Sequence, residues 1–225
     1  MGKTFFISDL HFGCVNQHDG RILEHDYIIK EKWNNVVTNA DIVYILGDIG
    51  REGSNKDNEY LCQIISTLKG KKILIQGNHE KLKDIRLRQL FTEVHSQKEI
   101  SIGVKGINYN LVLSHTPILM WNGQHKGWIH LYGHLHMSEE WNIYDKSLQM
   151  LNKYFLEQRR AGRTDCPAAE AYNVGAMLPY MDNEPKTIDE IIRGANQFYV
   201  ERYFNSWSDE QMREFLNSFE NANGE

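Results

Sequence analysis

The chain has 225 residues, 41% of them hydrophobic, which is enough to bury a substantial core within the usual size of one domain. A formal net charge of −5 argues against a protein that holds nucleic acid through its own cations alone, although a bound metal would still allow a phosphate-bearing substrate. The three cysteines are odd in number and far apart, which indicates neither a disulfide framework nor a CxxC zinc site. The apolar run Thr4–Ser8 is too short for a signal peptide or a membrane span, so we expect a cytoplasmic protein.

The first half of the chain alternates short apolar runs with segments of helical periodicity. The apolar runs are rich in β-branched residues and end at polar or glycine-containing turns, which predicts buried strands at Thr4–Ser8, Asp41–Leu46 and Lys72–Gln76. Apolar residues at helical spacing predict helices at His25–Thr38, Asp57–Leu68 and around Lys81–Leu90. This alternation predicts a sheet with helices on its faces.

The second half of the chain has a different pattern of predicted elements. Two runs around the turn Lys105–Asn108 predict an antiparallel hairpin, at Glu99–Val104 and Tyr109–Ser114. Further strands are expected at Ile129–Tyr132 and Ala171–Val174, and helices at Asp145–Arg160, after the capping box Thr187–Glu190 with an end at Gly194, and at Ser208–Phe219 before a frayed tail, Asn221–Glu225. No linker is evident, so we predict one α/β domain over residues 1–225 with two packed sheets and helices outside.

Polar residues follow five of the predicted strands directly, and several of them are histidines. In sheets with helices on their faces, ligands bind at the carboxyl ends of the strands, where the loops converge. Turn chemistry explains Gly, Asn and Asp at such positions, but it does not call for histidine. The residues are Asp9 and His11, Asp48, Asn78 and His79, His115, and His134 and His136.

The stretch Tyr132–His136, YGHLH, places two histidines one residue apart. In an extended segment, residues i and i+2 share a face, so His134 and His136 would point at the same spot. Two converging imidazoles suggest a metal site, because neutral imidazole is the commonest metal ligand. The alternative is a strand end with two solvent-facing histidines.

Taken in order, D-x-H, G-D, G-N-H-E, a single H and G-H-x-H resemble the motifs of the calcineurin-like metallophosphoesterases, from Thr4 to about Gly194. Three further stretches resemble small bacterial and phage phosphoesterases of unassigned substrate: Ser8–Gly13, Trp121–Gly127, and Asn173–Gly175 leading to Lys186–Ile192. Cys14 stands where we expect such relatives to carry a histidine, so no role is carried over to it. The resemblance implies two packed mixed β-sheets flanked by helices in four layers, with a motif-bearing core at 4–194 and a helical extension at 195–225.

The resemblance also implies two divalent metal ions. Asp9, His11 and His136 would hold the first ion. Asn78, His115 and His134 would hold the second, and Asp48 would bridge both. Carboxylate, amide and imidazole ligands without thiolate favour Mn, Fe or Zn over copper or cluster iron, and over the harder cations Ca and Mg.

The implied activity is hydrolysis of a phosphomonoester or phosphodiester by a metal-bridging hydroxide, which two metals generate from water near neutral pH. His79 would act as the general acid that protonates the departing oxygen. Its alternative role is that of a loop histidine bonded to a carboxylate. Glu80 either orients His79 or is a carboxylate favoured by the start of a helix.

The substrate is less well defined by the sequence. Arg21, Asn16 and His125 are candidates for contacts with a small phosphate ester or nucleotide; nucleic acid is expected only as a substrate, and no membrane partner is expected. The charged cluster Arg159–Arg163 could bind an anion but is more typical of a solvated face. Trp121 and Lys126 could also contact substrate, although tryptophan is more typical of a core.

Three other functional classes fit the sequence less well. A non-catalytic scaffold on the same fold would have lost ligands, whereas every position is filled here. A metallo-β-lactamase-like enzyme would carry H-x-H-x-D-H, which does not occur. The branch with G-D-x-x-D-R-G is not matched by Gly47–Gly53, while monoester, diester and pyrophosphate cleavage all stay open.

Overall fold

The computed structural model describes residues 2–14 and 24–204, which form two four-stranded sheets with helices around them. Asn16 and Arg21, the predicted helix Ser208–Phe219 and the tail Asn221–Glu225 lie outside the described residues. Of the predicted extension 195–225, only the part up to residue 204 is described.

The first sheet is built from parallel strands in the order in which they occur along the chain. Apolar runs form its first three strands. The first pairs with the second from Thr4 opposite Ile42 to Ile7 opposite Ile45, and the second pairs with the third from Ile42 opposite Lys71 to Ile45 opposite Leu74. This register brings the carboxyl ends of the strands to one edge. The elements are β1 (Thr4–Ile7), α1 (His25–Val36), β2 (Ile42–Ile45), α2 (Asn55–Ser66), β3 (Lys71–Ile75), α3 (Ile85–Arg88) and β4 (Glu93–His95).

The second sheet is mixed. An antiparallel hairpin forms one side, and its loop is the two-residue turn Lys105-Gly106 rather than four residues; both have positive φ, as such tight hairpins require. The following strands pair in parallel. The elements are β5 (Gln97–Val104), β6 (Ile107–Ser114), the 3₁₀ turn η1 (Gln124–Lys126), β7 (Ile129–Tyr132), α4 (Glu139–Arg160), β8 (Ala171–Asn173) and α5 (Ile188–Phe204).

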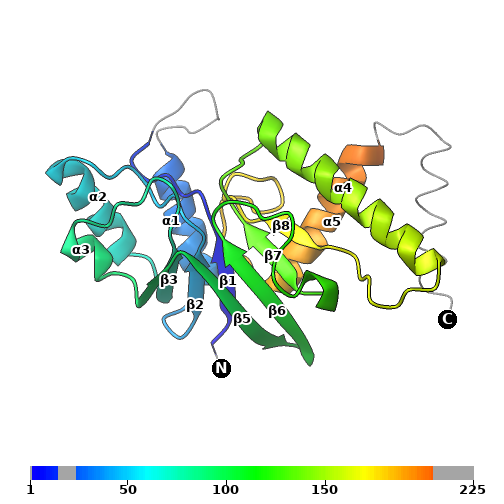
Figure 1. The fold of residues 1–225 in the computed structure, drawn as a ribbon. Helices are drawn as coiled ribbons and strands as arrows, with labels where there is room; N and C mark the ends of the chain where they lie inside the picture. The colour runs from blue at the N-terminus through cyan, green and yellow to red at the C-terminus, as the bar shows by residue number, and fades with distance from the viewer. Residues whose placement is uncertain (1, 15–23, 205–225) are drawn as a thin grey trace.

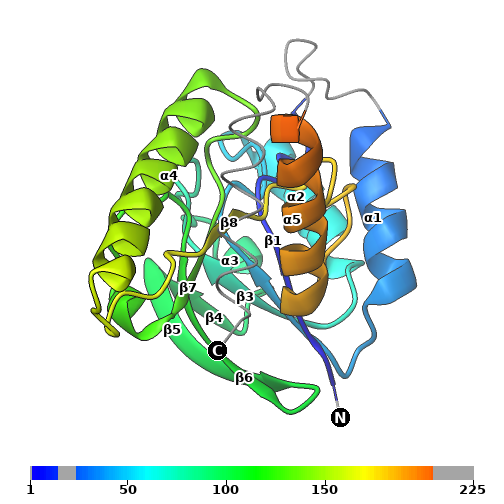
Figure 2. The same ribbon diagram turned by 90° about the vertical axis from the view of Figure 1, so that its right-hand side faces the viewer.

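Helices enclose the two sheets, which pack on each other in the predicted arrangement. In Figure 1, α1, α2 and α3 lie on the side of the first sheet, and α4 and α5 lie on the side of the second. Figure 2 shows α4 and α5 in front of the strands, and α5 packs against both β1 and β8. One hydrophobic cluster runs through both sheets, including the fully buried Phe6, Ile45, Leu113 and Leu131. Among the described residues, no helix is both long and apolar enough to cross a membrane.

The sheets are joined where β1 ends. The Ser8 amide donates to the Val174 carbonyl at 2.8 Å, and the Ala176 amide donates back to the Ser8 carbonyl at 2.9 Å. The chain after β1 is thus held against the chain after β8, directly before Asp9.

Three helices differ most from the sequence-based expectation. The helix expected at Lys81–Leu90 is a single turn, α3, capped by Asp84. Helix α4 begins at Glu139, six residues before the predicted Asp145, because Ser138 caps its first turn. Helix α5 runs on through Gly194, where an added Cβ would lie 3.0 Å from the Tyr180 Cβ; this glycine serves close packing and does not end the helix.

Candidate metal centre

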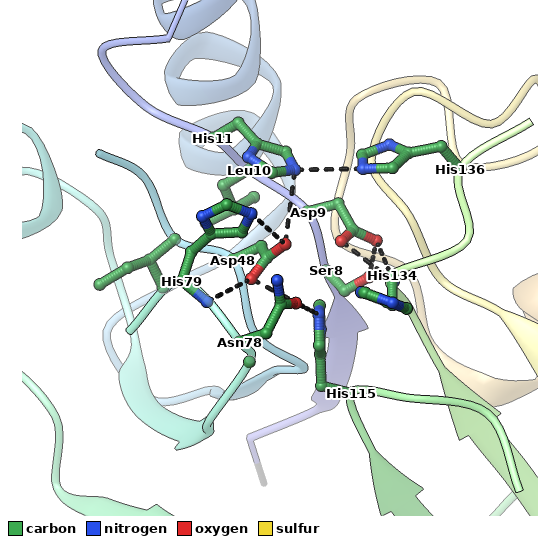
Figure 3. A network of polar contacts seen from close by, with 12 residues as sticks. Ser8, Asp9, Leu10, His11, Asp48, Asn78, His79, His115, His134 and His136 are labelled. Atoms are coloured by element: carbon green, nitrogen blue, oxygen red, sulfur yellow. Dashed lines mark hydrogen bonds and ion pairs between the residues drawn. The ribbon is translucent and has the colours of Figure 1, made fainter. Parts of the chain in front are cut away.

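The residues predicted from the strand ends converge at one edge of the two sheets (Figure 3). Each follows its strand directly: β1, β2 and β3 on the first sheet, and β6 and β7 on the second. Their ligand-type atoms form two groups, in each of which all atoms lie within 4.8 Å of one another. The groups are Asp9, His11 and His136, and Asp48, His115 and His134.

In the first group, two ring nitrogens face each other: Nε2 of His11 lies 3.2 Å from Nε2 of His136. The buried Asp9 carboxylate accepts hydrogen bonds from the Ser8 hydroxyl at 2.6 Å and from the His134 amide at 3.0 Å and 3.1 Å. Burial raises the pKa of Asp9, and the nearby imidazole of His136 opposes this shift. A cation beside the carboxylate would favour its charged form.

The second group contains a histidine in a fixed orientation. Nδ1 of His115 contacts the Leu46 carbonyl at 2.8 Å, which requires that nitrogen to carry the proton and leaves a lone pair on Nε2. That Nε2 lies 2.9 Å from Oδ1 of Asn78, so two acceptor atoms face each other at the separation of neighbouring ligands on one ion. Burial, and then His115, lower the pKa of His134, which favours the neutral imidazole that metals bind. This donor chemistry fits a metal ion.

Asp48 lies between the two groups. Its Oδ2 is 3.7 Å from Nε2 of His11 in the first group, and its Oδ1 is 3.4 Å from Nε2 of His115 in the second. The side chain is 3% exposed. The loop that carries Asp48 is hydrogen-bonded to the loop after β1, because the His11 amide donates to the Asp48 carbonyl at 2.9 Å. One carboxylate thus points an oxygen at each group.

The backbone at the candidate ligands is left-handed rather than extended. The φ angles are 56° at Asp9, 47° at His11, 54° at Asp48, 72° at His134 and 46° at His136. The segment YGHLH is therefore not extended at its histidines, which lie at a bend and a turn. They still face one site and belong to different groups, as the family resemblance implies. Such conformations are sparsely populated for non-glycine residues and cluster at functional sites.

Glycines precede three of the candidate ligands because a side chain there would occupy the site. An added Cβ at Gly47 would lie 2.4 Å from Nδ1 of His115. At Gly77 it would lie 2.4 Å from Oδ1 of Asp48, and at Gly133 it would lie 2.2 Å from the Ser8 hydroxyl. The glycines of G-D, G-N and G-H thus allow the close approach of polar groups.

Glu80 has neither of the roles considered from the sequence. Its buried carboxylate accepts from the Ile49 amide at 2.6 Å and from the Gly77 amide at 2.5 Å, and no helix starts at this residue. Burial raises its pKa. The side chain ties the loop after β2 to the loop after β3, and so holds Asp48 beside Asn78.

His79 lies at the open rim of the site. Its side chain is 61% exposed, and its Nε2 is 4.0 Å from Oδ2 of Asp48, which is too long for a hydrogen bond. The His79 backbone amide instead donates to Oδ1 of Asp48 at 3.3 Å. The ring meets His11 edge-on with centroids 5.9 Å apart. The imidazole is therefore next to both groups and accessible from solvent.

The substrate candidates do not join this cluster within the described residues. His125 is exposed on η1, which precedes the amino end of β7, whereas His134 and His136 follow its carboxyl end. Arg21 and Asn16 lie outside the described residues.

Two residues missed by the sequence reasoning support the site from α1. Nε2 of the buried His25 contacts the Leu10 carbonyl at 3.0 Å, and the Asp26 carboxylate accepts from the Gly13 amide at 2.8 Å. Both hold the loop that carries His11. Asp26 carried a weak signal, an acidic residue in the first turn of a helix, but nothing in the sequence pairs it with Gly13.

Comparison with known proteins identifies the family. A family model described as calcineurin-like phosphoesterase matches residues 2–170, which include every candidate ligand. The Gene 66 protein of Mycobacterium phage L5 is 31% identical over 163 residues, covering 60% of this chain and 78% of the relative. An uncharacterized protein of Methanocaldococcus jannaschii is 30% identical over 144 residues, covering 60% of this chain and 70% of the relative.

A solved structure shares the fold. The crystal structure of a protein of unknown function from Aquifex aeolicus aligns with a TM-score of 0.58 and 23% identity, covering 86% of this chain and 99% of that one. The architecture, the candidate ligand groups and the family match agree, and the chain belongs to the calcineurin-like phosphoesterase family.

Proposed function

We propose that the chain is a dinuclear metal-dependent phosphoesterase. Asp9, His11 and His136 would hold one divalent ion. Asn78, His115 and His134 would hold the other, and Asp48 would contact both. The observation that carries this proposal is the position of Asp48, whose two oxygens lie 3.7 Å and 3.4 Å from ring nitrogens of different groups.

The ligand types favour Mn, Fe or Zn in both positions. When bound, such ions supply a nucleophile from water near neutral pH and positive charge for the phosphoryl oxygens. The chain's own contribution is orientation. Ser8 and the His134 amide fix the Asp9 carboxylate, and the Leu46 carbonyl fixes the tautomer of His115.

His79 is proposed as the general acid. Its imidazole is exposed at the rim, next to both groups, so a departing alkoxide or phenoxide can reach it. Hydrolysis adds water across the P–O bond, and the proton that the leaving oxygen needs would come from this ring. The backbone contact from the His79 amide to Asp48 keeps the ring beside the reacting phosphate without using either ring nitrogen.

The substrate class is proposed as a phosphomonoester or phosphodiester, either a small phosphate ester or a nucleotide, with nucleic acid only as a substrate. We also propose a cytoplasmic location; the cysteines Cys14, Cys62 and Cys166 are free thiols, as expected in a reducing compartment.

A substrate screen tests the activity. Manganese-loaded protein is assayed on chromogenic mono- and diesters, and then on cyclic nucleotides, pyrophosphate and nucleic acids. We expect metal-dependent turnover of at least one ester. A protein that binds metal but cleaves none of these substrates would instead act as a scaffold on the same fold.

The ligand assignment is tested with Asp48→Ala, which should lose bound metal and activity together. The control is Asp165→Ala, because Asp165 is an exposed aspartate whose partners among residues 2–14 and 24–204 are its neighbours Arg163 and Cys166. Unchanged metal stoichiometry in Asp48→Ala, measured by elemental analysis, would refute the ligand set.

A further inference from the structure

A recess of about 220 Å³ is lined by residues that follow two of the candidate ligands, His11 and Asp48, along the chain. Its walls come from the loop after β1, the loop after β2 and the first turns of α2. The lining residues are Phe12, Gly13, Arg51, Lys56, Asp57 and Tyr60. Gly13 is two residues from His11, and Arg51 is three residues from Asp48. The backbone of each of these two lining residues therefore lies within about 10 Å of the backbone of a candidate ligand.

Hydrogen bonds hold the walls of the recess in place. The Asp26 carboxylate accepts hydrogen bonds from the Tyr60 hydroxyl at 2.6 Å and from the Gly13 amide at 2.8 Å. The Arg51 amide donates to the Phe12 carbonyl at 3.1 Å. Gly13 has a φ of 76°, and an added Cβ would lie 3.3 Å from the Tyr60 ring. The shape of the recess is therefore set before any ligand binds.

Two cations and one carboxylate line the recess, and a second carboxylate, that of Asp26, supports its wall. Arg51 and Lys56 contribute two cations, and within the part of the chain that the structure describes neither side chain forms a hydrogen bond or ion pair. Asp57 contributes one carboxylate, which accepts from the Ser54 amide at 3.1 Å and from its hydroxyl at 2.8 Å in the cap of α2. The Ser54 hydrogen bonds and, to a smaller extent, the charges of Arg51 and Lys56 lower the pKa of Asp57, so the two cations are near this carboxylate but not bonded to it.

The volume limits what the recess holds. Pockets for whole drug-sized ligands measure about 300–1,000 Å³, so this recess accommodates a single group and not an entire substrate. A guanidinium is suited to phosphate, which it binds through two parallel hydrogen bonds. The Tyr60 ring, 39% exposed, adds an apolar wall for the sugar or base that carries the phosphate.

We propose that the Arg51 recess binds a second phosphate of the substrate, one nucleoside away from the phosphate under attack. The substrate class is then a nucleotide with phosphates at both its 3′ and 5′ ends, whether free or at the end of an oligonucleotide. This inference rests on the proposed phosphoesterase activity, because the recess and the metal groups would share one substrate.

The test compares adenosine 3′,5′-bisphosphate with adenosine 5′-monophosphate as inhibitors of chromogenic ester hydrolysis by the manganese-loaded full chain. The bisphosphate should bind about tenfold more tightly, because a charge-assisted hydrogen bond in a partly exposed site contributes about that factor to affinity. Arg51→Gln should bring the ratio of the two inhibition constants close to one. Arg160→Gln, the same change at the exposed end of α4, is the matched control and should keep the wild-type ratio.

Equal inhibition by both nucleotides, or a ratio that Arg51→Gln leaves unchanged, would overturn the proposal. A 5′-phosphorylated dithymidylate distinguishes the sources: inhibition stronger than that of the bisphosphate indicates an oligonucleotide end, and weaker inhibition indicates a free nucleotide. If no ester is hydrolysed, the proposed activity fails by itself. The recess is then tested by calorimetric titration of the same two nucleotides, with the same expected ratio and the same variants.

Discussion

At the scale of single residues, several candidate ligands have a left-handed backbone conformation, which is unfavourable for residues other than glycine. Five of the nine non-glycine residues with positive φ in the described chain are candidate ligands. A left-handed residue costs about 1–2 kcal/mol, less for aspartate than for branched residues, so this site stores several kcal/mol that packing elsewhere must offset. Contacts such as Ser8 to Asp9 and Leu46 to His115 hold the conformation.

His79→Ala should keep both metals and lose turnover by about 100-fold to 10,000-fold, the usual contribution of a general acid. The loss should be larger for alkyl esters than for nitrophenyl esters, because poor leaving groups need the proton more. The measurement is kcat on both ester types together with metal content.

His95→Ala is the control for that variant. His95 ends β4 at the same edge of the first sheet, but its ring pairs with Glu93 at 2.7 Å and not with the metal groups. It should retain wild-type turnover. An unaltered rate of His79→Ala on an alkyl ester would remove His79 from the mechanism.

Glu80→Gln tests how the two ligand loops are held together. The carboxylate accepts from two backbone amides, and an amide side chain would place a donor against one of them. The free energy of unfolding should fall by about 1–3 kcal/mol, the cost of an unsatisfied buried group. Metal affinity should fall with it, because Asp48 and Asn78 lose their shared support.

Glu52→Gln is the matched control for Glu80. Glu52 also accepts from two backbone amides, those of Lys81 and Leu82, but it is partly exposed, so water can replace a lost contact. Chemical denaturation should show the larger loss for Glu80→Gln. Equal losses would mean that the burial of Glu80 does not increase its contribution to the free energy of unfolding.

At the scale of elements, the strands that deliver the site could be predicted because each is an apolar run stopped by a polar turn. The three parallel strands and the hairpin were found within two residues at each end, apart from the tightness of the hairpin turn. β4 was missed because its three residues, Glu93–His95, contain one apolar side chain. It forms only by pairing with β3, and no local pattern encodes such pairing.

The candidate site, too, could be predicted from the sequence only in part. Its residue types are visible at the strand ends, but the left-handed backbone at His134 and His136 is not. The His134 amide donates to the Asp9 carboxylate, which follows a strand of the other sheet, and no local pattern encodes such a contact. The supporting roles of Glu80 and Asp26 could not be predicted either. Glu80 accepts from the Ile49 amide in the loop after β2, and Asp26 accepts from the Gly13 amide in the loop after β1. Sequence spacing carries no record of these partners.

Gly133→Ala tests the close approach at the end of β7. The new methyl group would lie 2.2 Å from the Ser8 hydroxyl and 2.7 Å from Oδ2 of Asp9, so the turn must shift. We expect a loss of about 1–3 kcal/mol in the free energy of unfolding, as for other overpacked sites, and weaker metal binding.

The control is Gly53→Ala, where the nearest atom to the new methyl group is Oδ2 of Asp57 at an ordinary 3.6 Å. Neither glycine needs a positive φ, so the two substitutions differ mainly in space. Thermal unfolding and metal titration should separate them. Equal behaviour would contradict the steric explanation for the glycine of G-H-x-H.

At the scale of the whole molecule, the site lies across the junction of the two sheets. Asp9, Asp48 and Asn78 follow strands of the first sheet, whereas three histidines follow strands of the second: His115, His134 and His136. The backbone pairing of Ser8 with Val174 and Ala176 holds the sheets together at this place. Metal binding should therefore stabilise the packing of the whole chain, since ions that bind only the folded state add to its stability.

His130 should make the stability of the chain depend on pH. Its ring is buried in the second sheet, contacting the Val112 carbonyl and the Ile118 amide, and burial lowers its pKa to about 4 from 6.5. Between these values the unfolded chain binds a proton that the folded chain does not, so stability falls as the pH drops below 6.5. At pH 5 the loss relative to pH 7.5 is about 2 kcal/mol from this residue.

The measurement is urea unfolding at pH 7.5 and pH 5 in the presence of a chelator. In His130→Gln, the drop between the two pH values should be smaller than in the wild type by about 2 kcal/mol. His125→Gln removes an imidazole from the exposed η1 and should leave the drop unchanged. A full wild-type drop in His130→Gln would contradict the buried neutral state of this ring.

Segments far apart in the chain are proposed to form one dinuclear metal site. The most direct test is anomalous diffraction from a crystal soaked in manganese. We predict two anomalous peaks, one bounded by Asp9, His11 and His136 and the other by Asn78, His115 and His134, with Asp48 in contact with both. A map with no peak between these groups, or with manganese bound only elsewhere, would contradict the account.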